Sequence, residues 1–388
     1  MLSRNIKFKN FSNISNISKV SSIYRDIKKN YSKKNFNLLV SLSKNYKYSY
    51  NYKFVNKYKN FKDYIVIGMG GSILGAKAIY QFLKFKIKKN FFFIDNLISK
   101  IKIKKKNYVT LIISKSGNTL ETISNFNVIL KKNKNIIITE NQDSYLNNLA
   151  KKIKSEIIEH KNFIGGRFSV LSEAGMLPAQ LMGLKEAKFK RFNYLINNKE
   201  FEKSLVKNVA ATLNLIKEKK NLSIILNYDK NSENIFYWYQ QLIAESLGKK
   251  SKGILPVVSS MPRDNHSLMQ YYLDGPKKSF FTFFSVLEKN SNKINNKYLL
   301  KSYSYLKNKS LNKILDSQIK ATKNIFEKRK IPFRSFTILN RSEESLGELF
   351  CFFILETILL GRALKVNPFD QPAVELIKKE TKKILLRN

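Results

Sequence analysis

Acidic residues are scarce in this sequence, and cysteine, tryptophan and histidine are almost absent from it. Lys and Arg number 72 against 28 Asp and Glu in 388 residues, which gives a formal net charge of +44. The basic residues are scattered through every segment and do not gather into one arm, so a compositional bias explains them better than a nucleic-acid surface does. We therefore predict no specific nucleic-acid partner. The charge should still attract anionic substrates and raise their association rate at low salt.

A single cysteine, Cys351, excludes an intrachain disulfide and favours a reducing compartment. We expect a cytoplasmic protein in which Cys351 is a buried core residue. The apolar run around it, LFCFFILETILL, is too short to span a bilayer and contains Glu356, so no membrane association is predicted. The N-terminus is basic and free of acids, as transit peptides are, but the residues after it have the same composition. We interpret it as part of the mature protein.

The length allows two domains, and the hydrophobic fraction of 43 % supports a core in each. Residues 1–60 are polar and helix-prone in patches. Beyond them, short apolar runs alternate with amphipathic segments, which is typical of parallel sheets covered on both faces. Strands are predicted at 63–71, 90–96, 108–118, 135–141, 221–228, 278–287 and 334–340. Helices are predicted at 72–87, 119–133, 233–249 and 343–364.

This alternation predicts an α/β protein with two doubly wound parallel-sheet domains, at residues 61–190 and 191–365. The polar, partly helical segment 1–60 precedes the two domains. Residues 366–388 follow them and are predicted to form a C-terminal helix.

A glycine turn joins the first predicted strand to its helix, in VIGMGGSILGAKAI at 66–79. Turns of this kind often hold a phosphate. A dinucleotide fingerprint would need a third glycine where Ile73 stands, and a P-loop would need Gly-Lys-Ser/Thr where Gly75 is followed by Ala76. Neither nucleotide template fits, and the turn alone leaves the ligand open.

A second phosphate signal is SKSGNTLET at 114–122, which follows a predicted strand and opens a helix. Ser114, Ser116 and Thr119 offer hydroxyls, and the loop backbone offers N–H groups near the positive end of the helix dipole. The stretch is therefore a suitable cradle for a phosphomonoester. The alternative is an ordinary helix start with Thr119 as its N-cap.

Two further segments carry groups suited to acid–base chemistry. Arg167 directly follows two glycines in GGRFSVLSEAGMLPAQLMG, where it could stabilise an oxyanion, hold a phosphate or make a structural ion pair. Gln241 and Glu245 stand four residues apart, on one face of a predicted helix, with Glu245 at the edge of an apolar stripe. A glutamate partly removed from water can act as a general base, although a helical glutamate is more often simply solvated.

Weaker signals come from the histidines and the terminal segment. His266 stands among turn residues in PRDNHSLMQYYLDG, where a proton-transfer group is useful, whereas His160 is expected at a strand end or on the surface. Gln371 and Lys378 are seven residues apart, close to two helical turns, so both should point the same way. In a chain this rich in lysine, Lys378 carries no signal by itself.

Six segments, taken in order, resemble the glucose-6-phosphate isomerase family of the sugar-isomerase (SIS) superfamily: IGMGGSILG, SKSGNTLET, GGRFSVLS, AESLGK, DNHSLMQ and NPFDQPAVELIKK. They span roughly residues 64–380. The resemblance implies two SIS-type domains and an aldose–ketose isomerase that interconverts glucose 6-phosphate and fructose 6-phosphate. It also implies that no metal or other cofactor is used, and that a homodimer forms with shared active sites.

The resemblance implies a role for each matching residue. Glu245 corresponds to the base that moves a proton between C2 and C1, and Arg167 to the arginine beside the enediolate. His266 corresponds to the ring-opening histidine, expected to reach into the neighbouring subunit, and Lys378 to its helper in the terminal active-site helix. The substrate-binding positions are Gly71, Ser72, Ser114, Lys115, Ser116, Thr119, Gln241 and Gln371.

The chain departs from the family pattern in a few places. Ser116 stands where many members have Thr, and Leu247 where Asn is common. Pro372 and Ala373 replace the usual Trp-Gly or Pro-Gly, and Ala373 restricts the backbone more than glycine does. None of these changes removes a catalytic group. The reduced N-terminal region leaves the oligomer contacts open.

Three alternatives remain beside this function. One is another SIS phosphosugar isomerase, including one that acts on mannose 6-phosphate. The second is a non-catalytic SIS regulator that binds a phosphosugar, and the third is a polyanion-binding protein suggested only by charge. The joint presence of Glu245, His266 and Lys378 favours an enzyme.

Overall fold

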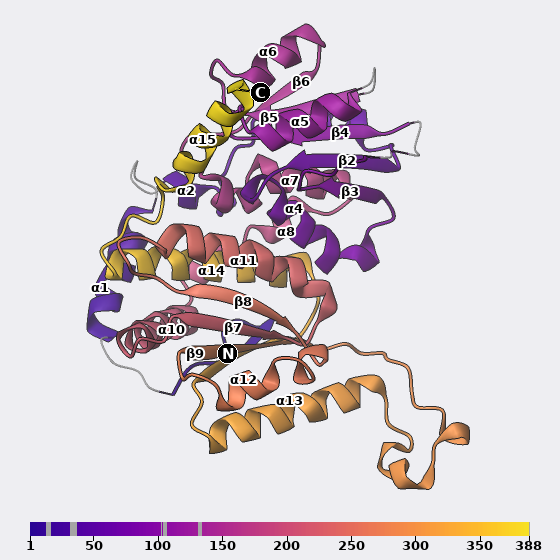
Figure 1. Cartoon of the computed structure of the whole chain (residues 1–388), viewed down its shortest axis with the longest axis vertical. Coiled ribbons are helices and arrows are strands. Elements are labelled where there is room, and N and C mark those ends of the chain that lie inside the picture. The colour runs from indigo at the N-terminus through magenta and orange to yellow at the C-terminus, as the bar shows by residue number, and fades with distance from the viewer. Residues whose placement is uncertain (13–16, 32–36, 102, 104–106, 131–133, 388) are drawn as a thin grey trace.

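The computed structural model describes residues 1–12, 17–31, 37–101, 103, 107–130 and 134–387. Two five-stranded sheets follow one another along the long axis of the molecule, with helices on their faces (Figure 1). The predicted α/β class with two doubly wound, mostly parallel sheets is confirmed. The domain boundaries at residues 60, 190 and 365 stay a prediction.

The first sheet is wholly parallel and has the strand order β3-β2-β4-β5-β6. Its strands are β2 (Asp63–Gly68), β3 (Asn90–Ile94), β4 (Val109–Ile113), β5 (Lys134–Thr139) and β6 (Glu156–Glu159). Alternate side chains enter separate cores, with Val66 in one and Ile67 in the other. The two faces are covered by α4 (Gly71–Phe82) and α7 (Glu173–Leu181) on one side and by α5 (Leu120–Ile129) and α6 (Tyr145–Lys152) on the other.

The second sheet has the order β1-β10-β9-β7-β8. Its strands are β1 (Ile6–Lys9), β7 (Leu222–Asn227), β8 (Leu255–Ser260), β9 (Ser279–Val286) and β10 (Phe333–Ile338). All pairings are parallel except that of β1, which lies antiparallel at the edge. One face carries α10 (Lys199–Lys217), α11 (Glu233–Leu247) and α14 (Glu343–Ala363), and the other carries α12 (Met269–Asp274) and α13 (Leu311–Lys328).

Helices between the two sheets join them into one body. α11 packs against α4 of the first sheet and against α14 of the second (Figure 1). Almost every residue of α14 is buried, and its stretch 349–355 is apolar on all sides. It contains Cys351, which is fully buried as predicted. It also contains Glu356, whose carboxylate forms a buried ion pair with Arg334 of β10.

Three strands escaped prediction. β1 and β6 have four residues each, and half of their residues are charged. β8 contains Pro256, which argues against a strand when only the sequence is read. The predicted helix 119–133 corresponds to α5, and the last residues of that prediction, 131–133, lie outside the described residues.

The remaining helices are short or lie at the ends of the chain. They are α1 (Ile17–Asn30), α2 (Asn37–Val40), α3 (Tyr52–Tyr58), α8 (Glu186–Phe189), α9 (Phe192–Ile196), α15 (Val374–Arg387) and the 3-10 helices Lys84–Lys86, Gly166–Leu171, Lys230–Ser232, Arg263–Asn265, Asn296–Tyr298 and Lys301–Leu306. Over the part of the chain that the structure describes, none of the helices has both the length and the apolar character required to cross a membrane.

Candidate active site

Two loops that follow neighbouring strands of the first sheet lie side by side. β2 and β4 are adjacent and parallel, with Gly68 opposite Ile113, so the chain leaves both strands at the same edge. One exit passes through Met69 and Gly70 into α4, and the other passes through residues 114–119 into α5. The carboxyl edge of such a sheet is the usual ligand site in open α/β folds.

The glycines of the first loop allow two other segments to approach it closely. Gly70 has a φ of 51°, and a Cβ atom at this position would lie 2.6 Å from Nε2 of Gln241. A Cβ atom on Gly71 would lie 2.3 Å from the backbone nitrogen of Arg167. Ser72, in the first turn of α4, is buried next to them. The glycine turn therefore packs directly against Gln241 and Arg167.

The second loop presents hydroxyls at the start of α5. Oγ of Ser114 and Oγ1 of Thr119 are 2.9 Å apart and share a hydrogen bond. Thr119 occupies the N-cap position, but its side chain makes no capping hydrogen bond. Oγ of Ser116 accepts a hydrogen bond from the backbone nitrogen of Asn118 at 3.3 Å. The Thr119 side chain therefore leaves the first N–H groups of α5 uncapped, as an anion site requires.

Lys115 turns toward the loop that precedes Arg167. Its Nζ donates to the carbonyl oxygen of Asn162 at 2.9 Å and lies 3.4 Å from Oε1 of Glu140. A pocket of about 290 Å³ opens here, and its walls include Lys115, Gly165 and Phe369. The loop 114–119 and the terminal segment of the chain therefore both contribute walls to this pocket.

Arg167 is almost completely buried, and its guanidinium is bonded in several directions. The acceptors are Oγ of Ser246 for Nε at 2.7 Å, Oε1 of Gln371 for Nη1, and the carbonyl oxygens of Pro368 and Asp370 for Nη2 at 2.6 and 3.1 Å. Burial lowers the pKa of this guanidinium, and nearby carboxylates oppose that effect. An arginine stays charged in this situation, so the site contains a fixed positive charge.

The carboxylate of Glu245 lies between that charge and an amide. Its Oε1 is 3.3 Å from Nη1 of Arg167, and its Oε2 accepts a hydrogen bond from Nε2 of Gln241 at 2.9 Å. The Glu245 side chain is 19 % exposed, so it is largely removed from water. Gln241 and Glu245 share one face of α11, as the spacing predicted. A proton acceptor beside a fixed cation can abstract a proton next to a carbonyl and stabilise the resulting oxyanion.

The terminal segment 367–371 is held at this site from two sides. Arg167 binds it from one side, as described. From the other side, Nζ of Lys249 donates to the carbonyl oxygen of Asn367. It also donates to the carbonyl oxygen and to Oδ1 of Asp370, at 2.6 Å in both cases. The rings of Phe168 and Phe369 also pack, with centroids 5.8 Å apart. Gln371 therefore reaches the site through a clamped segment.

The expectation that Gln371 and Lys378 share a helix face is wrong. α15 begins at Val374, so Gln371 precedes the helix. Pro372 explains the difference, because the residue before a proline is driven away from helical backbone angles. The Lys378 side chain is 59 % exposed and pairs with Glu375 at 2.7 Å. Within one chain, no contact of the described residues joins Lys378 to Glu245.

His266 also lies away from Glu245 within one chain. It follows β8, whose last residue, Ser260, donates a hydrogen bond to Glu233 at the start of α11. Glu245 is twelve residues further along that helix, or about 18 Å at 1.5 Å per residue. The His266 side chain is exposed, and among the described residues it has no hydrogen bond. The other histidine, His160, is at a strand end as expected, but it is buried.

Sequence reasoning missed three residues that build this site. Ser246 and Lys249 adjoin Glu245 in AESLGK, and Asp370 adjoins Gln371 in the terminal segment. Lys249 lies beyond the end of α11 at Leu247, so its spacing from Glu245 gave no signal of a shared helix face. The abundance of lysine in the chain also hid it.

A model of the phosphoglucose isomerase family matches residues 50–261, which is more than half of the chain. The chain belongs to the phosphoglucose isomerase family. Among its relatives, the glucose-6-phosphate isomerase of Methanocaldococcus jannaschii is 32 % identical over 367 residues, covering 87 % of this chain and 86 % of that protein. The glucose-6-phosphate isomerase of Mycoplasmopsis synoviae is 34 % identical over 346 residues, covering 81 % and 80 %.

Solved structures resemble this phosphoglucose isomerase family member in fold. A hypothetical protein from Thermus thermophilus superposes with a TM-score of 0.80 at 22 % identity, over 95 % of this chain and 96 % of that one. A glucose-6-phosphate isomerase from Chlamydia trachomatis gives 0.66 at 19 % identity, over 86 % and 71 %. The family predicted from the six segments is confirmed.

Proposed function

We propose that this chain is an aldose–ketose isomerase that interconverts glucose 6-phosphate and fructose 6-phosphate. One observation supports this function most directly: the Glu245 carboxylate is held between the Arg167 guanidinium and the Gln241 amide, beside two loops of the phosphate-binding type. The relatives named glucose-6-phosphate isomerase support the choice of substrate. A non-catalytic phosphosugar regulator has no use for a proton acceptor at this position.

The phosphate of the substrate binds at residues 114–119. The uncapped start of α5 supplies backbone N–H groups and the positive end of the helix dipole, and Ser114, Ser116 and Thr119 supply hydroxyls. This binding energy is remote from the reacting carbons. It places C1 and C2 next to Glu245 and so contributes to the rate by positioning.

Glu245 then moves the proton. It takes the hydrogen of C2 as a proton, the electron pair of that bond forms the C1–C2 double bond, and the C1 carbonyl oxygen becomes an oxyanion. A proton passes from the C2 hydroxyl to the oxygen on C1, and Glu245 returns its own proton to C1. Arg167 stabilises the enediolate because its charge is fixed in place before the reaction.

The ring-opening step is assigned to His266 and Lys378, as the family resemblance implies. Neither residue reaches Glu245 within one chain, as described above. A homodimer in which one copy supplies His266 to the pocket of the other accounts for this separation. We place the reaction in the cytoplasm, consistent with the single buried thiol.

A coupled assay tests the proposal. Purified protein with fructose 6-phosphate and EDTA should form glucose 6-phosphate, detected by reduction of NADP⁺ with an added glucose-6-phosphate dehydrogenase. Activity in EDTA is expected because the proposed chemistry uses only Glu245, Arg167 and the proton-transfer pair. Folded protein that binds 6-phosphogluconate but converts neither hexose phosphate would contradict an isomerase and support a regulator.

A further inference from the structure

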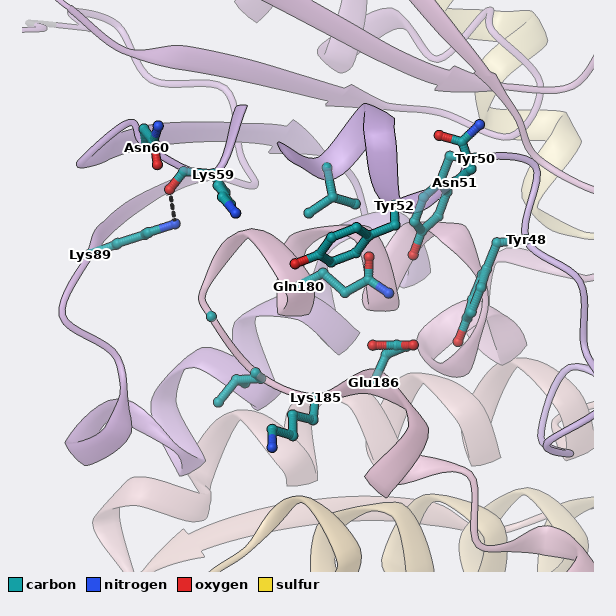
Figure 2. Close-up of a pocket in the computed structure, with 13 residues that line it drawn as sticks. Tyr48, Tyr50, Asn51, Tyr52, Lys59, Asn60, Lys89, Gln180, Lys185 and Glu186 are labelled. Atoms are coloured by element: carbon teal, nitrogen blue, oxygen red, sulfur yellow. Dashed lines mark hydrogen bonds between the residues drawn. The ribbon is translucent and has the colours of Figure 1, made fainter. Parts of the chain in front are cut away.

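A second pocket lies apart from the candidate active site, where residues 48–52 meet α7 and the loop 183–186 (Figure 2). Its volume is about 620 Å³, within the range of roughly 300–1,000 Å³ that is usual for small-molecule sites. None of its lining residues belongs to the candidate active site. A ligand here would therefore not compete with the substrate of the isomerase.

One wall of this pocket is aromatic. The rings of Tyr48 and Tyr50 stack with centroids 5.1 Å apart, and their hydroxyl oxygens are buried without a hydrogen-bond partner among the described residues. Tyr52 extends from the same segment over the pocket, and it is 71 % exposed (Figure 2). An exposed flat ring at the mouth of a pocket offers a stacking face for another flat ring.

Lysines form another side of the pocket. Lys59 and Lys89 lie together, since Nζ of Lys89 donates to the carbonyl oxygens of Lys59 and Leu181. Burial and the charge of Lys59 lower the pKa of Lys89. Lys185 also lines the pocket, from the loop before α8, and its amino group lies away from those of Lys59 and Lys89 (Figure 2). Neither Lys59 nor Lys89 has an acidic partner among the residues that the structure describes, so an anion beside them would relieve their mutual repulsion.

Two further polar side chains line the pocket and bear on the choice of ligand. Gln180 of α7 and Glu186 of α8 point into the pocket, and the described residues provide no hydrogen-bond partner for either side chain (Figure 2). An amide and a carboxylate can pair with the N–H groups of a base or with sugar hydroxyls. Three lysines against one glutamate leave an excess of two positive charges, which favours a ligand with a phosphate.

We propose that this pocket binds a mononucleotide. The base stacks on Tyr52, Gln180 and Glu186 meet the polar edge of the base or the sugar, and the phosphate lies beside Lys59 and Lys89. A sugar phosphate lacks the flat ring, and a nucleoside lacks the charge, so each should bind less tightly. The inference is independent of the isomerase function.

Isothermal titration calorimetry of the full chain tests this site. AMP, GMP and UMP are titrated in turn at physiological salt, in the presence of excess fructose 6-phosphate so that the candidate active site is occupied. At least one should bind with a stoichiometry of one per chain, while its nucleoside and inorganic phosphate should each bind at least about tenfold more weakly. Tyr52→Ala should weaken binding at least about fivefold, because the stacking face is lost.

A matched control is available elsewhere in the chain. Tyr298 resembles Tyr52 in its surroundings: Nζ of Lys297 lies 5.7 Å from the Tyr298 ring centroid, and Nζ of Lys59 lies 5.8 Å from that of Tyr52. Tyr298 is also 75 % exposed, but it lines no part of this pocket. Tyr298→Ala should therefore leave the Kd unchanged. The proposal is overturned if no nucleotide binds at millimolar concentration, or if both tyrosine variants weaken binding equally. The isomerase assay reports separately, so failure here leaves that function untouched.

Discussion

Arg167 is at once a structural and a chemical residue. The sequence left open a structural ion pair, a contact to an oxyanion or a contact to a phosphate, and the first two concern the proposed chemistry. Arg167 forms a 3.3 Å ion pair with Glu245. Hydrogen bonds to Ser246 and to the terminal segment also hold its guanidinium in place. A charge fixed in this way needs little reorganisation when a substrate oxyanion forms, so the two interpretations are compatible.

The buried histidine should make the stability of the protein depend on pH. Nδ1 of His160 lies 3.1 Å from the carbonyl oxygen of Lys161, and Nε2 has no partner among the described residues. Burial, together with the charge of Lys115, lowers the pKa of His160 from 6.5 to about 4. Between these values the unfolded chain holds a proton that the folded chain lacks, so stability is lost as pH falls through this window.

His160→Gln should remove that dependence. Between pH 7 and pH 4.5 the parent should lose about 2–3 kcal/mol more unfolding free energy than the variant, since each pKa unit corresponds to about 1.4 kcal/mol. Urea denaturation of both proteins at the two pH values measures the difference. Equal losses in parent and variant would show that His160 does not titrate differently on folding.

The cradle hydroxyls are expected to act on binding. In Ser116→Ala with Thr119→Ala, the affinity for 6-phosphogluconate should fall at least about tenfold, because each hydrogen bond to a charged group contributes about 1.5–3 kcal/mol. Calorimetric titration measures this change. Ser317→Ala serves as the control, since within the described part of the chain that hydroxyl is bonded only to its own helix, at the Lys313 carbonyl. Unchanged affinity in the double variant would mean that the phosphate binds elsewhere.

At the level of elements, the sequence predicts those whose signal is local. β2, β4 and β5 are continuous apolar runs buried on both faces, and each has a predicted counterpart. β1 could not be predicted, because its four residues become a strand only through pairing with β10, more than 300 positions away. The same limit applies to the site. The spacing of Gln241 and Glu245 predicted their shared face, but the segment that Arg167 binds is about 200 residues away, and only the family resemblance pointed to it.

The terminal segment should be loosened by removing one lysine. Lys249→Ala deletes every hydrogen bond from Nζ to Asn367 and Asp370, so the backbone amides of residues 367–371 should exchange with deuterium at least about tenfold faster. Hydrogen exchange followed by mass spectrometry measures this rate. Lys250→Ala is the matched control, because no side-chain contact of Lys250 is found among the described residues. Similar exchange in both variants would show that the clamp at Arg167 is sufficient.

At the scale of the whole molecule, a single chain exposes apolar surface. It also keeps the two assigned catalytic residues, His266 and Lys378, away from its own active site. α15 has no buried residue, and its exposed apolar side chains are Val374, Leu376, Ile377, Ile384, Leu385 and Leu386. A net charge of +44 opposes self-association, so an interface between copies must bury enough apolar area to overcome the repulsion, and salt should favour it. We expect the homodimer proposed above to cover apolar surface of this kind and so to overcome the repulsion.

Mixing inactive variants tests whether sites are shared. Glu245→Gln and His266→Ala should each be inactive alone, and activity should return after subunits exchange, because some mixed dimers then contain one site with both groups intact. Tags of different mass on the two variants verify the exchange. Proven exchange without recovered activity would place Glu245 and His266 in the same chain's site.

The central claim is that Glu245 carries a proton between C2 and C1, and deuterium incorporation tests it most directly. Fructose 6-phosphate is incubated in D₂O with parent or Glu245→Gln protein and followed by NMR. The parent should give glucose 6-phosphate with deuterium at C2 after many turnovers, because a carboxyl proton exchanges with solvent. The variant should be at least about 10²-fold slower, the low end for losing a general base, and should still bind substrate. Conversion without any deuterium at C2, or equal incorporation by the variant, would contradict the account.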